Sequence, residues 1–105
     1  IPAGTLEPGE EPAACAAREL AEEIGCRAGR LELLTSFFVA PGYSSERIHL
    51  FLARDLEPAE AEADADEAIE EVLVPLADAV AMVKDGRIED AKSCLGILLA
   101  AERCA

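Results

Sequence analysis

Apolar positions change their spacing along the chain, and each change predicts an element. Over residues 12–24 they recur at helical spacing, with Pro12 at the start and Gly25 just past the end. Proline suits the first helical turn because its missing N–H has no partner there, and glycine often ends a helix. We therefore predict a helix over 12–24. Its apolar stripe, expected to pack on a sheet, comprises Ala13, Ala17, Leu20 and Ile24.

Strand character follows in the middle of the chain. Residues 31–40 and 47–56 are rich in Leu, Phe, Val and Ile and flank the turn dipeptide Pro41-Gly42. The second segment alternates through Ile48, Leu50 and Leu52. Residues 70–74 predict a further, shorter strand.

Two helices are predicted after these strands. Pro75 opens the first, and Gly86 ends it. Asp90 is suited to cap the second. The apolar positions of the two helices are Leu76, Ala79, Val80 and Val83, then Leu95, Leu98 and Leu99. Periodicity alone leaves the fold class open between α/β and α+β.

Three carboxylates share one face of the helix predicted at 12–24. Glu19, Glu22 and Glu23 stand at i, i+3 and i+4, where like charges repel by a few tenths of a kcal/mol per pair. A cation among them would remove this repulsion, and clustered carboxylate oxygens suit Mg²⁺ or Mn²⁺. Taken alone, the cluster also fits a solvated acidic face with an Arg18–Glu22 pair.

A longer pattern surrounds these carboxylates. It reads G-x5-E-x7-R-E-U-x-E-E-x-G, where U is apolar, and is formed by Gly4, Glu10, Arg18, Glu19, Leu20, Glu22, Glu23 and Gly25. A solvated face requires neither Gly4 nor Glu10 upstream. The pattern is similar to the Nudix box, and the chain resembles the Nudix hydrolases. Cys26 departs from it, because Ile, Leu or Val is usual there.

The resemblance implies an α/β/α sandwich with a mixed sheet and metal-dependent hydrolysis of a nucleoside diphosphate linked to another group. The metal ligands it implies are the carbonyl of Ala3 and the carboxylates of Glu19, Glu22 and Glu23. Glu22 and Arg18 are also implied in catalysis, Arg18 by orienting carboxylates through charge-assisted bonds. Gly4 begins the substrate-binding loop, which Glu10 braces. Divalent ions would neutralise the diphosphate and activate the attacking water.

Three further segments resemble the ADP-ribose pyrophosphatase branch of that family. Pro41 follows Cys26 by 15 residues, and residues 45–53 and 85–92 are similar to that branch. The resemblance adds Pro41, Gly42 and Glu46 to the substrate-binding residues, although Pro41-Gly42 alone reads as an ordinary turn. The reaction implied is ADP-ribose and water to AMP and ribose 5-phosphate. The alternatives are another nucleotide sugar such as GDP-mannose, or a non-catalytic Nudix-like nucleotide-binding module.

An acidic run extends from residue 57 to residue 71 without Lys or Arg. Such a run is typical of a solvated loop. The resemblance implies that one acid of this loop assists at the metals as ligand or general base. Glu67 is the first choice, with Asp66 and Asp64 as the alternatives.

Composition then limits the partners. The 105 residues carry a net charge of −13, which would repel a nucleic acid backbone and also requires metal to mediate contact with a nucleotide. There is no apolar run long enough for a membrane span and no signal-peptide pattern, so we expect a cytoplasmic protein. The four cysteines have no metal-binding or disulfide spacing and are expected to be free thiols.

Lone aromatic side chains and the single histidine give weaker signals. His49 is expected to be a strand residue leaning on its neighbours. Tyr43, Phe37 and Phe38 are expected in the core, with stacking on a base as the alternative.

The chain begins at Ile1, three residues before the box glycine and without an initiator Met. We therefore expect residues 1–105 to be the C-terminal portion of one Nudix domain, incomplete at its N-terminus. Strands left with exposed edges would favour self-association, and a homodimer is expected.

Overall fold

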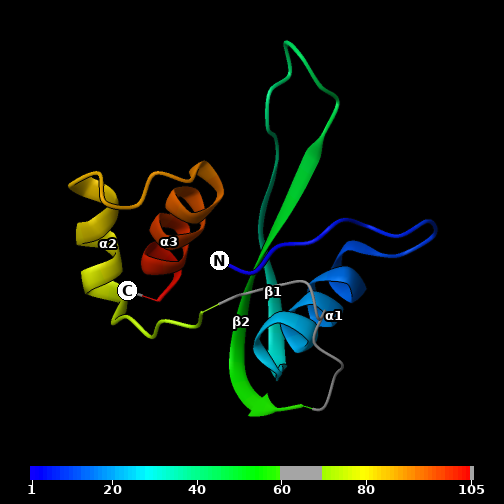
Figure 1. Ribbon diagram of the computed structural model, residues 1–105, viewed down its shortest axis with the longest axis horizontal. Coiled ribbons are helices and arrows are strands. Elements are labelled where there is room, and N and C mark those ends of the chain that lie inside the picture. The colour runs from blue at the N-terminus through cyan, green and yellow to red at the C-terminus, as the bar shows by residue number, and fades with distance from the viewer. Residues whose placement is uncertain (60–69, 105) are drawn as a thin grey trace.

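Three helices and one hairpin make up the computed structural model, which describes residues 1–59 and 70–104 (Figure 1). In chain order the elements are α1 (Pro12–Ile24), β1 (Cys26–Phe38), β2 (Arg47–Pro58), α2 (Leu76–Lys84) and α3 (Ala91–Arg103).

Helix α1 begins and ends where the sequence predicts. Pro12 is its first residue, and Gly25 follows it in the left-handed conformation with φ 70°. The Gly25 N–H donates to the Ala21 carbonyl, as expected for a glycine-ended helix.

The buried side of α1 differs from the predicted stripe. Leu20 is buried, but Ala13 and Ala17 are exposed and Cys15 is buried instead. The stripe was therefore wrong at two of its four positions. The loop before the helix folds back over the side of α1 that carries Cys15 and is bound there through Arg18. The buried face of α1 is therefore turned toward Cys15, away from Ala13 and Ala17.

Strands β1 and β2 form an antiparallel hairpin. Their register runs from Cys26 opposite Pro58 to Phe38 opposite Arg47, with a bulge between Leu33 and Thr35. Both strands extend beyond their predicted ends near the open end of the hairpin. Pairing continues there through polar positions, where no hydrophobic period could indicate it.

The strand predicted at residues 70–74 is absent, and this prediction was wrong. The segment has no regular structure, and Leu73 within it is 96% exposed. A strand is stabilised by hydrogen bonds to a neighbouring strand. Within residues 1–59 and 70–104 the sheet consists of β1 and β2 alone, so a mixed sheet is not formed within this part of the chain.

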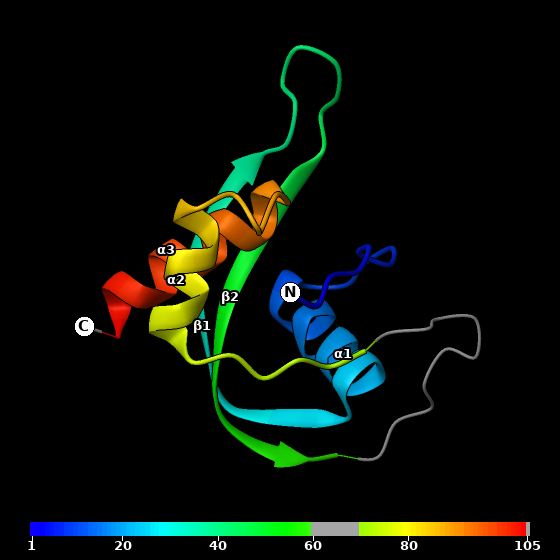
Figure 2. The same ribbon diagram turned by 60° about the vertical axis from the view of Figure 1, so that its left-hand side comes forward.

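Helices lie on both sides of the hairpin. Figures 1 and 2 show α1 on one side and α2 with α3 on the other. Leu50 on β2 is buried and lies against Gly96 of α3. Both helices predicted after the strands are confirmed, and Asp90 caps α3 by accepting from the N–H groups of Lys92 and Ser93. The layered α/β/α arrangement thus agrees with the predicted class.

None of the helices among residues 1–59 and 70–104 has the length and apolar character needed to cross a bilayer.

Candidate functional site

Arg18 is the centre of the charged group on α1. Its Nε and Nη2 donate to the two oxygens of Glu10 at 2.9 and 3.0 Å, a bidentate pair. Its Nη1 donates to Glu19 at 2.9 Å and to Glu22 at 3.3 Å. One guanidinium therefore pairs with three carboxylates of the box, among which the Glu19 side chain is only 15% exposed.

The loop before α1 is bound to the same helix. Arg18 Nη2 also donates to the carbonyl of Thr5 at 3.2 Å. Glu10 accepts from the N–H of Glu7 at 3.0 Å, and the N–H of Glu10 donates back to the carbonyl of Glu7. Glu10 thus braces the loop, the role the resemblance implies for it.

Gly4 stands at the closest approach of this loop to the helix. A methyl group built on its α carbon would overlap the carboxylate and Cγ of Glu19. Only a residue without a side chain fits beside Glu19 in this arrangement. The close packing of the loop against Glu19 therefore explains why the box has a glycine at this position.

Glu23 lies at the other end of the loop. Its Oε2 accepts from the N–H of Ala3 at 3.0 Å. This bond uses the amide of Ala3, and the carbonyl implied as a metal ligand takes no part in it. Both Ala3 and Gly4 nevertheless lie next to the carboxylates of α1.

Charge pairing perturbs the ionisable groups of this region. The Arg18 hydrogen bond, followed by that of the Glu7 amide, lowers the pKa of Glu10 to about 2. The same pairing with Glu10 raises the pKa of Arg18. Burial is the main cause that raises the pKa of the Cys15 thiol, so the thiol stays protonated at neutral pH.

The donor chemistry of this group fits a hard divalent cation. Glu19, Glu22 and Glu23 supply carboxylate oxygens from one rigid helix, as Mg²⁺ and Mn²⁺ prefer. Glu19 and Glu22 accept from Arg18, and Glu23 accepts from the Ala3 amide. Accordingly, no set of three or more His, Cys, Asp or Glu side chains in the described part of the chain is arranged around a common cation position.

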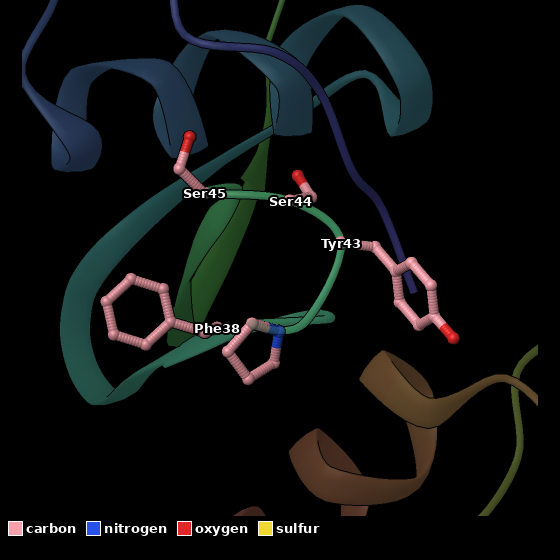
Figure 3. A pocket seen from close by; sticks show the side chains of 5 residues that line it. Phe38, Tyr43, Ser44 and Ser45 are labelled. Carbon is pink, nitrogen blue, oxygen red and sulfur yellow. The ribbon is translucent and has the colours of Figure 1, made fainter.

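The other predicted substrate residues lie at the far end of the hairpin. Pro41, Gly42 and Glu46 belong to the loop between β1 and β2, which projects beyond the helices in Figures 1 and 2. Pro41 lines an open hollow of about 330 Å³, together with Phe38, Tyr43, Ser44 and Ser45 (Figure 3). The structure therefore does not bring these residues to the carboxylates of α1 within one chain.

Aromatic residues of this loop differ from expectation. Tyr43 is 98% exposed and Phe38 is 55% exposed, so placing them in the core was wrong. In Figure 3 the Tyr43 ring points away from the Phe38 ring, on the other side of the loop. The hairpin tip projects from the body, so these rings do not reach the core, and the Arg47 guanidinium lies over the Phe38 ring, 5.6 Å from its centroid. Phe37 is half-buried.

His49 is a strand residue, as predicted. Its Nδ1 lies 2.7 Å from the hydroxyl of Ser36, its partner across the hairpin. The acids expected to assist at the metals, Glu67, Asp66 and Asp64, lie outside the described residues.

Two partners in the charged group were not predicted. The Thr5 carbonyl and the Cys15 sulfur, 3.7 Å from Arg18 Nη2, both contact the guanidinium. The apolar run of small residues around Cys15 gives no sign of this contact. Only its position three residues before Arg18, one helical turn away, could have suggested it.

The charged group and the surrounding fold correspond to a known family. Residues 1–94 match the NUDIX domain. The chain belongs to the Nudix family. The residues around Arg18 are thus the Nudix box in its folded form, with Gly4 and the carboxylates of α1 in place.

Individual Nudix proteins are similar over most of this chain. The ADP-ribose pyrophosphatase of Bacillus subtilis (strain 168) is 44% identical over 99 residues, covering 92% of this chain and 54% of the relative. The GDP-mannose pyrophosphatase of Citrobacter koseri is 38% identical over 96 residues, covering 89% of this chain and 50% of the relative.

A solved Nudix-type structure supports the fold directly. The crystal structure of an ADP compounds hydrolase superposes with a TM-score of 0.82 at 33% identity, covering 92% of this chain and 52% of that one. This likeness confirms the Nudix α/β fold. The chain spans about half the length of the relatives it matches.

Proposed function

We propose that the protein is a Nudix pyrophosphohydrolase that cleaves a nucleoside diphosphate linked to a sugar, with ADP-ribose giving AMP and ribose 5-phosphate. One observation carries the proposal. All charged positions of the Nudix box are present, and Arg18 joins Glu10, Glu19 and Glu22 at 2.9–3.3 Å. A module that only binds nucleotide has no need for all of them.

Glu19, Glu22 and Glu23 are the proposed holders of a divalent ion, Mg²⁺ or Mn²⁺, with the Ala3 carbonyl as a further ligand. Such an ion supplies charge neutralisation for the diphosphate and for the leaving oxygen. The carboxylates lie on one rigid helix, which favours a fixed arrangement of ligands.

The residues around them have positioning roles. Arg18 holds Glu19 and Glu22 while its bidentate pair with Glu10 keeps the guanidinium fixed. Gly4 allows the loop to approach Glu19 closely, so that a phosphate group meets backbone instead of a side chain.

The chemical step is substitution at phosphorus. The water oxygen forms a bond to one phosphorus, the bridging P–O bond breaks, and the bridging oxygen leaves with the other phosphate. A carboxylate takes the proton of the water; Glu22 is one proposed acceptor, and Glu67, Asp66 or Asp64 of the acidic run is the other.

Two relatives support the substrate class and leave a choice within it. The pyrophosphatase named for ADP-ribose is 44% identical, and the one named for GDP-mannose is 38% identical. The segments containing Pro41, Gly42 and Glu46 favour ADP-ribose. GDP-mannose is the second candidate, and comparison of kcat/KM for the two substrates decides between them.

Replacing Glu23 by Gln tests the enzyme proposal. We expect the rate to fall by more than the ~10–100-fold that outer-shell partners of metal sites typically contribute. The melting temperature should change little, because Glu23 lies on the half-buried surface of α1.

Glu89→Gln is the matched control, since Glu89 is exposed between α2 and α3. A Glu23→Gln protein with full turnover would refute the ligand assignment. An unchanged protein that binds nucleotide with no turnover would favour the non-catalytic module.

A homodimer and a cytoplasmic location complete the proposal. Val72 and Leu73 expose apolar surface, at 70% and 96%, that a partner could cover. The cysteines are free, as suits a reducing compartment. Light scattering that finds an active monomer would exclude the dimer.

A further inference from the structure

The buried thiol of Cys15 contacts the Arg18 member of the Arg18–Glu10 pair. Cys15 lies in the first turn of α1 and is 7% exposed. Its Sγ accepts from Arg18 Nη2 at 3.7 Å, and the same Nη2 donates to Glu10 Oε1 at 3.0 Å. No position of the Nudix box assigns a role to this residue.

A change at the Cys15 thiol can also affect residues that it does not contact, through Arg18. Arg18 has two bonds to Glu10 and one each to Glu19 and Glu22, so rotation of the guanidinium would move both carboxylates. Cys15 is also in line with them, because residues 15, 19 and 22 share one face of a helix. A protonated thiol can donate to Glu10 and accept from Arg18 at the same time.

We propose that Cys15 is a positioning residue that fixes the Arg18–Glu10 pair and thereby orients Glu19 and Glu22. The effect on metal binding rests on the proposed function. The effect on Arg18 itself does not, because it concerns contacts within the protein.

Cys15→Ser and Cys15→Ala provide a matched pair of variants. Serine keeps one donor and one acceptor, whereas alanine removes both at nearly the same volume, so the two differ mainly in polar contact. The first measurement is the rate at which the Arg18 Nε–H exchanges with solvent, detected by NMR. Its signal is identified by its loss in Arg18→Lys.

We expect Arg18 Nε–H exchange to be about fivefold faster in Cys15→Ala than in Cys15→Ser, the size of effect that one lost hydrogen bond produces. Cys94→Ala should leave this rate unchanged, since Cys94 bonds to the Ile88 carbonyl and lies on α3. Equal exchange in the two Cys15 variants would overturn the proposal and reduce Cys15 to a packing residue.

The second measurement is Mn²⁺ affinity by calorimetry. The alanine variant should bind Mn²⁺ more weakly than the serine variant. Equal affinities alongside unequal exchange would overturn the proposed link from Cys15 to Glu19 and Glu22. If the unchanged protein binds no Mn²⁺, the proposed function fails, while the exchange rates still decide the role of Cys15 at Arg18.

Discussion

At the scale of single residues, the site depends on how closely the loop before α1 approaches the helix. Gly4 meets the carboxylate of Glu19 there, and the N–H of Ala3 meets Glu23. These contacts explain why the box needs a glycine six residues before Glu10. They also make the geometry sensitive to one methyl group.

Gly4→Ala tests this closeness. The added methyl group would force Glu19 or the loop to move, and a displacement of about 1 Å at a catalytic group can lower a rate by about 100-fold. We expect a loss of that order in kcat. Gly96→Ala on α3 is the control, because an added methyl group there makes only ordinary van der Waals contacts, at 3.5–4.0 Å, with Ile1 and Leu50. A Gly4→Ala protein with an unchanged rate would contradict the close approach.

The Arg18–Glu10 pair predicts a pH dependence of stability. The pKa of Glu10 falls from an ordinary value of 4.5 to about 2 in the folded protein, so between these values the unfolded chain binds more protons. The free energy of unfolding should therefore decrease as the pH falls through this window and be constant for this group above it. Urea unfolding between pH 5 and pH 2 measures the decrease.

Glu10→Gln should reduce that slope. Some slope should remain, because the hydrogen bond from Ser93 is the main cause that lowers the pKa of Asp90 to about 2. The same slope in the unchanged protein and the variant would mean that the Arg18–Glu10 pair does not persist in solution.

Sequence predicts the charged residues of the site and fails at their neutral neighbours. Helical spacing alone places Arg18 one turn from Glu22, and the resemblance to the Nudix box adds Gly4 to the site. The contact of Cys15 depends on the loop folding back, and that path is not visible in any period. Tyr43 was misplaced because an aromatic side chain reads as core wherever it occurs, whereas its exposure is decided by the projection of the hairpin tip.

At the scale of elements, the sequence predicted helix ends best, because the residues that end a helix act within one helical turn. Gly25 and Asp90 mark helix boundaries through hydrogen bonds to residues two to four positions away, so sequence suffices to predict them. The ends of β1 and β2 and the segment 70–74 depend on pairing with distant residues. There the predictions were too short or wrong.

Asp90 offers a prediction for α3. Its side chain accepts from the N–H groups of Lys92 and Ser93, and removing such a cap costs about 1 kcal/mol. Asp90→Ala should lower the melting temperature, measured by circular dichroism, by about 5 °C. Asp90→Asn retains an acceptor and should lose less. Equal losses in both variants would assign the effect to charge instead of capping.

At the scale of the whole molecule, one carboxylate of the hairpin forms an ion pair with α3, in addition to the packing of Leu50 against Gly96. Glu32 on β1 pairs with Arg30 at 2.7 Å, Arg54 at 3.2 Å and Arg103 of α3 at 3.1 Å. This group lies on the side of the hairpin that carries α3, whereas the Nudix box lies on α1. The scaffold and the candidate site are therefore held by separate charged groups.

The candidate site also separates into two places within one chain. The carboxylates belong to α1, whereas Pro41, Gly42 and Glu46 belong to the projecting hairpin tip. Sequence could not foresee this separation, because it places residues by order and not by distance.

The most direct test of the enzyme proposal is release of AMP from ADP-ribose by the longest natural form of the protein, with Mg²⁺ and then with a chelator. We predict AMP and ribose 5-phosphate in equal amounts with Mg²⁺, and neither with the chelator. Absence of AMP from a folded, Mg²⁺-loaded protein would contradict the ADP-ribose assignment. Absence of hydrolysis of GDP-mannose as well would contradict the proposal that the Nudix box of this chain is catalytic.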